Sequence, residues 1–139
     1  MKTRVLLRKI YEILVADPPP GVRKVFEPGK PATFRQNMPA VLIQPDTPTK
    51  ETEYVAGDVK DTLLSCEVHV LTDGGYERME SRSHGSMDEA IEICEEIEET
   101  LEANPTLDDL VDDLESLKVH HFSPAHSWVR LTYRIRERR

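Results

Sequence analysis

The stretch Ser127–Arg136, SWVRLTYRIR, decides the fold class of this chain of 139 residues. Apolar and polar side chains alternate along it, which is the pattern of a β-strand with one buried and one open face. Lys118–Phe122 precedes it across the turn-forming segment 123–126, so the two segments predict a closing β-hairpin. The apolar positions of the last strand are Val129, Leu131, Tyr133 and Ile135.

The region before this hairpin predicts an amphipathic helix over Ser86–Ala103. Ser86 and Glu89 have the spacing of a capping box, and Asn104-Pro105 ends the helix because proline cannot continue it. The predicted buried stripe consists of Met87, Ala90, Cys94, Ile97 and Leu101. The residues expected to face water are Glu92, Glu95, Glu96, Glu99 and Glu102. The following Leu107–Leu117 segment fits two structures, a further helix or a short turn that leads into a strand.

The N-terminal half predicts one helix and three strands. The helix covers Lys2–Ala16, with Leu6, Ile10, Ile13 and Leu14 on one face and Leu7 beside them. The strands are expected at Val22–Phe26, Pro39–Ile43 and Thr62–Leu71. Polar loops are expected over 27–38 and 44–61, either as flexible segments or as arms that order against a partner.

Strands grouped between helices favour an α+β fold. We therefore expect a single domain over residues 1–139, with a mostly antiparallel sheet of four to five strands and two helices packed on one face. The N-terminal segment lacks the uninterrupted apolar stretch of a signal peptide, which predicts an intracellular origin. The two cysteines fit a reducing compartment.

The formal charge of −8 argues against general nucleic-acid binding, which requires a basic surface. Acidic residues concentrate over 88–115, and basic residues concentrate near both ends of the chain. These clusters are either solvated faces or complementary surfaces between copies of the chain. The candidate residues for a subunit or partner interface are Arg130, Arg134, Arg136, Glu95, Glu99 and Trp128. Trp128 is otherwise expected in a cross-strand contact within the hairpin.

No motif predicts catalysis, and neither a cofactor nor a metal is expected. The adjacent His120 and His121 would point to opposite faces of a strand, and the aspartates over 108–113 lack the spacing of a calcium loop. Cys66 and Cys94 fall on predicted apolar faces, as small core residues do.

The order, length and spacing of these segments resemble those of the tail terminator, or tail-completion, proteins of long-tailed phages and archaeal tailed viruses. The resemblance rests on the N-terminal helix, the strand Pro39–Gln44 (PAVLIQ) and the helix Ser86–Ala103. It continues through the segment 103–111 (ANPTLDDLV) and the last strand Val129–Tyr133 (VRLTY). It spans nearly the whole chain, and it would place a strand within Leu107–Leu117.

The resemblance implies a virion structural protein without enzyme activity. Such proteins form a homo-hexameric ring at the head-proximal end of the tail, where they end polymerisation of the tail tube protein. The ring then binds the head-tail connector protein, and the genome passes through its lumen without sequence-specific contacts. Location in the virion tail after assembly in the host cytoplasm, with no membrane partner, follows from this role.

Three other functions stay open on the sequence alone. The first is a head-closure or head-tail adaptor ring component. The second is a small ligand-binding or regulatory dimer, which would need a concave apolar pocket with a few polar groups. The third is an enzyme that combines Cys66, His69 and the His120–His121 strand.

Overall fold

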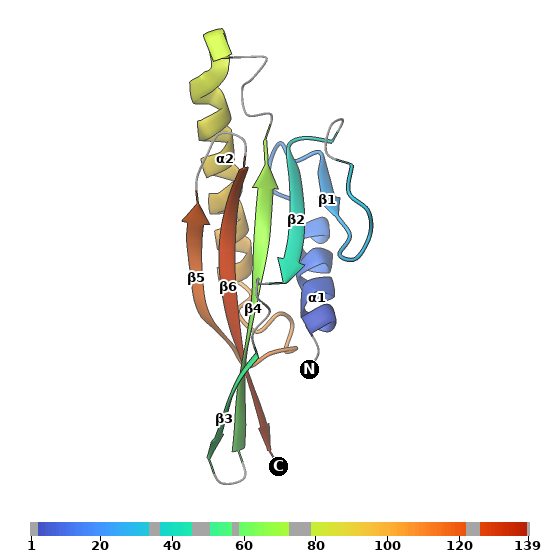
Figure 1. The fold of residues 1–139 in the computed structure, drawn as a ribbon, viewed down its shortest axis with the longest axis vertical. Coiled ribbons are helices and arrows are strands. Elements are labelled where there is room, and N and C mark those ends of the chain that lie inside the picture. Colours follow the sequence, from blue (N-terminus) through green and yellow to red (C-terminus); the bar gives the residue numbers. More distant parts are fainter. Residues whose placement is uncertain are drawn as a thin grey trace.

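A computed structural model describes residues 3–33, 37–45, 51–56, 59–72, 79–121 and 126–138. Within these residues the fold has two helices and six strands (Figure 1). The helices are α1 (Thr3–Ala16) and α2 (Met79–Glu102). The strands are β1 (Lys24–Phe26), β2 (Ala40–Pro45), β3 (Glu51–Ala56), β4 (Val59–Leu71), β5 (Asp113–His121) and β6 (His126–Arg138).

The strands form one sheet in the order β1-β2-β4-β6-β5, with β3 paired to β4 beyond the end of β2. All pairs are antiparallel except the short β1–β2 pair, which is parallel. The predicted α+β class with a mostly antiparallel sheet is confirmed, although the sheet has six strands. The long strand β4 lies in the middle of the sheet, and it contains the predicted strand Thr62–Leu71.

Both helices cover the same face of the sheet and lie behind the strands in the view of Figure 1. α1 packs on β1 and β2, whereas α2 packs on β4, β5 and β6. The alternation of each strand explains this, since every second side chain points into the layer between sheet and helices. The fully buried sheet residues of this core include Val41, Cys66, Val68, Val70, Val129, Leu131 and Tyr133.

The predicted helical faces agree with the core, with one addition. Leu6, Leu7, Ile10 and Leu14 of α1 are buried, and Ile13 packs at the edge of the core. On α2, the buried residues are Ala90, Ile93, Cys94, Ile97 and Leu101. Ile93 was missing from the predicted stripe, and the side chain of Met87 lies outside the described part of the structure.

The prediction of a loop over 44–61 was wrong for most of that range. β2 continues to Pro45, β3 occupies Glu51–Ala56 and β4 begins at Val59. β2 and β3 pair with successive parts of the same edge of β4, so together they form one long interrupted hairpin with it. The part built by β3 extends beyond both helices (Figure 1). A strand that no helix covers needs no apolar face, so residues 51–56 lack the pattern that reveals a strand.

The prediction that Ser86 starts the second helix was also wrong. α2 begins at Met79, which places Ser86 and Glu89 inside the helix and removes their capping role. The spacing of a capping box is a local signal, and it occurs here within a longer helix. The other predicted loop, 27–38, contains no helix or strand in its described residues, while 34–36 lie outside them.

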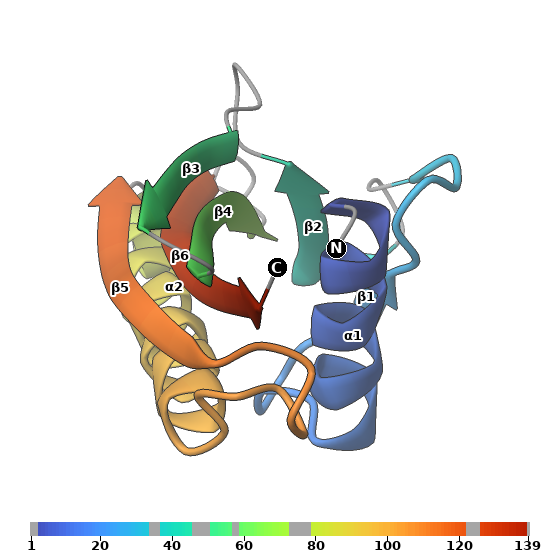
Figure 2. The ribbon, with the colours of Figure 1, turned by 90° about the horizontal axis from the view of Figure 1, so that it is seen from below.

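The segment Leu107–Leu117, which fitted either a helix or a turn and a strand, is a turn followed by the start of β5. Leu107, Asp108 and Asp109 all have left-handed backbone angles, with φ of 48°, 58° and 67°. Asn104 stabilises this turn, since its Nδ2 donates to Asp108 Oδ1 at 2.9 Å and its Oδ1 accepts from the Asp108 backbone N–H at 3.0 Å. The turn carries the chain from α2 across to α1 before β5 begins (Figure 2).

Candidate interaction surfaces

The face of the sheet opposite the helices carries a polar row across four strands. Gln44, Glu67, Arg130 and Lys118 are successive cross-strand neighbours from β2 to β5. The next row toward the β3 end contains Ser65 and Thr132, whose hydroxyl oxygens are 2.9 Å apart and share a hydrogen bond. Alternation puts these side chains on the open side of the strands whose other residues build the core.

The three predicted interface arginines lie along this open face, but two of them already have carboxylate partners. Arg134 Nη2 is 2.8 Å from Glu115 Oε2, and Arg136 Nε donates to Asp61 Oδ1 at 3.2 Å. Arg130 is exposed in the polar row. Exposed pairs of this kind contribute about 0–1 kcal/mol each, so they orient the arginines more than they stabilise the fold.

The predicted acidic partners, Glu95 and Glu99, lie on the other side of the molecule. They are exposed on α2, whose opposite face packs on the sheet through Ile93 and Ile97. The structure therefore does not bring the arginines and these glutamates together within one copy. Any contact between the two sets requires two copies of the chain.

A histidine cluster surrounds the predicted interface residue Trp128. The ring of His69 stacks on Trp128 and on His126, with ring centroids 5.5 and 4.9 Å apart. His69 Nε2 is 3.1 Å from Glu67 Oε1, and His69 Nδ1 is 2.6 Å from His126 Nε2. When both rings are neutral and His69 donates to Glu67, His69 must accept from His126. Trp128 is half-buried. It lies opposite His121 in the β5–β6 hairpin, where the cross-strand contact was expected, but its ring stacks on His69 of β4, outside the hairpin.

This cluster was not predicted as a site, because its members come from distant parts of the sequence. The register of β4 with β6 pairs His69 with Trp128 and Leu71 with His126. Cys66, which an enzyme would have to combine with His69, lies on the buried face of β4 instead. Among the described residues, no group of three or more histidine, cysteine or carboxylate side chains is arranged to hold a metal ion.

In its described part, from residue 89 onward, the outer surface of α2 is a stripe of glutamates with no basic residue among them. Burial raises the pKa of the Glu98 carboxyl, and the nearby Glu102 and Glu95 raise it further. No ion pair of these glutamates occurs within the part of the chain that the structure describes. The helix therefore carries a repulsion that a partner with positive charge would relieve.

Replacing Glu98 by glutamine is expected to raise the free energy of unfolding at pH 7 by about 0.5 kcal/mol, because it removes two repulsive pairs. A carboxyl whose pKa is raised in the folded state favours folding when protonated, and that contribution is lost as pH rises. The gain should therefore shrink toward about pH 4, where glutamate itself becomes protonated. Urea unfolding at both pH values measures it. Glu12→Gln, which removes a carboxylate beside Arg8, is the control and should give no gain.

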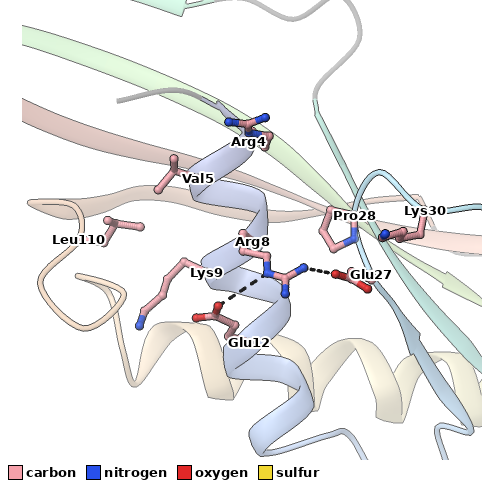
Figure 3. A pocket seen from close by; sticks show the side chains of 9 residues that line it. All are labelled: Arg4, Val5, Arg8, Lys9, Glu12, Glu27, Pro28, Lys30 and Leu110. Atoms are coloured by element: carbon pink, nitrogen blue, oxygen red, sulfur yellow. Dashed lines mark hydrogen bonds and ion pairs between the residues drawn. The ribbon is translucent and has the colours of Figure 1, made fainter.

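A groove of about 430 Å³ runs along α1, between the loop that follows β1 and the turn that precedes β5. Its lining residues are Arg4, Val5, Arg8, Lys9, Glu12, Glu27, Pro28, Lys30 and Leu110 (Figure 3). Sequence reasoning missed it, since three segments far apart in the chain form its walls. The one feature of the sequence that points to this groove is the cluster of basic residues over 4–9.

Ion pairs fix two of the four cations of this groove. Arg8 pairs with Glu27 across the groove and with Glu12 on its own helix at 3.7 Å. The hydrogen bond from Arg8 holds the pKa of Glu27 below its usual range. Lys9 Nζ is 3.0 Å from Asp108 Oδ2, and together with Asn104 it lowers the pKa of Asp108. These pairs tie α1 to the loops on either side of it.

No protein-family model matches this chain, and no curated protein matches it. Within the described residues, none of the helices combines the length and apolar character that crossing a membrane requires.

Proposed function

We propose that this protein is a virion structural protein that forms a ring at the head-proximal end of a viral tail tube. There it ends tube polymerisation and joins the tail to the head connector. The proposal starts from the resemblance of the element order to tail terminator proteins. A strand, β5, begins at Asp113 within the Leu107–Leu117 segment, which agrees with the arrangement that the resemblance favours.

The observation that carries the proposal is the projecting arm. β3, the first half of β4 and the end of β6 extend past both helices as a narrow ribbon (Figure 1). Ribbons of few strands are marginally stable in water unless something packs on them. A protein whose sheet continues beyond its own core is therefore suited to contacts with a neighbouring subunit or with the tube.

The separation of charge supports assembly in a closed ring. The α2 glutamates and the exposed cations of the described residues occupy different surfaces of one copy. A ring of identical subunits needs two different complementary patches on each of them, because its interface is head-to-tail. A symmetric dimer would instead bury one self-complementary patch.

The test is a tube-capping experiment with the full chain. The tail tube protein encoded with it is polymerised alone and with this protein, and negative-stain images give tube lengths and end shapes. We expect shorter tubes with a ring at one end, and six-fold rings of the protein alone at high concentration. Unchanged tube lengths with bare ends, together with a tight dimer at every concentration, would refute the proposal. Binding to the connector without any effect on tubes would identify a head-tail adaptor.

One observation favours a second candidate, a small ligand-binding dimer. The groove along α1 falls within the volume range of small-molecule sites and has an apolar floor with polar groups around it. Light scattering separates the two candidates, since the ring model requires an assembly larger than a dimer.

A further inference from the structure

Two cations on the rim of the α1 groove have no ion-pair partner within the described residues. Arg4 and Lys30 are both exposed, whereas Arg8 and Lys9 are held by carboxylates of the same copy. Figure 3 shows Arg4 near the start of α1 and Lys30 on the loop across the groove. Lys30 also acts electrostatically on Glu27, which is already paired with Arg8. Cations without an ion pair among the described residues therefore lie on both sides of the groove.

The floor of the groove is apolar and open. The side chain of Val5 is 44% exposed, whereas most large aliphatic side chains of the described residues are buried or half-buried. Leu110 and Pro28, both half-buried, flank it. An occupant that fits must offer negative charge to the rim and aliphatic surface to the floor. A glutamate-rich helix does both, because each glutamate carries methylene groups below its carboxylate.

The chain itself contains such a helix surface. Glu92, Glu95, Glu99 and Glu102 are exposed on α2 at the spacing of one helical face. From Glu92 to Glu102, which is ten residue steps, this stripe is about 15 Å long. Arg4 and Lys30, which have no ion pair among the described residues, stand apart on the rim of the groove instead of converging on one point (Figure 3). This arrangement favours an extended acidic occupant over a small anion.

We propose that the α1 groove of one copy receives the glutamate stripe of α2 from a second copy. This inference rests on the proposed self-assembly and names its contact surfaces. Groove and stripe are different patches, so each bound copy keeps one of them free for the next copy, as a ring requires. The contact also relieves the repulsion around Glu98. It assigns to Arg4 and Lys30 the role that sequence alone gave to the C-terminal arginines, two of which already have partners.

Reciprocal charge reversal tests the contact. Arg4→Glu with Lys30→Glu forms one variant, and Glu95→Lys with Glu99→Lys forms the other. Sedimentation velocity should show that each variant alone self-associates at least about tenfold more weakly than the wild type, because like charges then face each other. An equimolar mixture of the two should recover association, since the stripe of each fits the groove of the other. Association of the wild type should weaken in molar salt, where the Debye length is about 3 Å.

Lys118→Glu is the matched control, because it reverses an exposed cation on the open sheet face. All substituted residues are exposed, and thermal unfolding verifies that the variants fold. Unchanged association of the groove variant, or an equal loss in Lys118→Glu, would overturn the inference. A wild type that stays monomeric at every concentration also overturns it and leaves the groove to another occupant, such as a small anion. The tube-capping experiment decides the proposed function separately, because a ring can assemble on the tube through other surfaces.

Discussion

Replacing Ile97 with alanine is expected to lower the free energy of unfolding by about 4 kcal/mol. Ile97 is fully buried in the middle of the apolar face of α2, which packs on the sheet. Truncation removes apolar surface from the core and leaves a cavity that two packed layers cannot close. This loss is a large fraction of the roughly 5–15 kcal/mol by which domains are stable. Chemical denaturation followed by circular dichroism measures it.

Val15→Ala is the matched control for this prediction. Val15 is also an aliphatic residue on a helix, but it is 47% exposed at the end of α1. Its truncation should change the free energy of unfolding by less than about 0.5 kcal/mol, as surface substitutions do. Equal losses at both positions would contradict the assignment of the apolar face of α2 to the core. Ile93 is also fully buried on this face, although the sequence analysis did not include it, so Ile93→Ala should behave like Ile97→Ala.

The elements that bury one face were predictable from the sequence. β4 and β6 show strict alternation, and α1 shows helical spacing, because the core requires an apolar residue at each inward position. Val68 and Val129, for example, are fully buried cross-strand neighbours on the predicted face. Where burial dictates the residue type, a local pattern is sufficient to identify the element.

The elements that extend past the core were not predictable in this way. β3 lies beyond the helices, so no apolar alternation marks it (Figure 1). The start of α2 was misplaced because a serine and a glutamate at capping distance also occur inside helices. The left-handed turn at 107–109 has no glycine. L-residues adopt this conformation at a cost of about 1–2 kcal/mol each, so leucine and aspartate gave no sign of it.

The candidate surfaces depend on which distant segments meet. The pair between Arg134 and Glu115 requires the register of β5 with β6, which contains an irregularity between Leu114 and Ser116. The α1 groove requires the turn at 107–109 to reach α1, as the pair between Lys9 and Asp108 shows. Neither relation leaves a local trace in the sequence. Charge clustering was therefore compatible with solvated faces and with complementary patches between copies, and it did not identify which cations pair within one copy.

Cys94 is expected to react with iodoacetamide roughly a thousandfold more slowly in the folded protein than in the unfolded chain at pH 8. Burial raises the pKa of its thiol to about 12, and Glu98 and Glu95 add to the effect. An unperturbed cysteine has a pKa of about 8.5, and only the thiolate is nucleophilic. Burial of the side chain beneath α2 also blocks access by the reagent. Mass spectrometry of timed samples in buffer and in urea measures the ratio.

Cys66 provides an internal comparison, because it is equally buried but lies on β4 instead of on a helix. If α2 opens locally before the sheet does, Cys94 should be alkylated first as urea is added, with Cys66 following at global unfolding. Rapid alkylation of native Cys94 without urea would contradict the packing of α2 on the sheet. It would also make Cys94 a candidate nucleophile, a role that its position in the core argues against. Slow alkylation in buffer and fast alkylation in urea would show that the Cys94 thiol is a packed core residue. A structural role in assembly requires no reactive thiol.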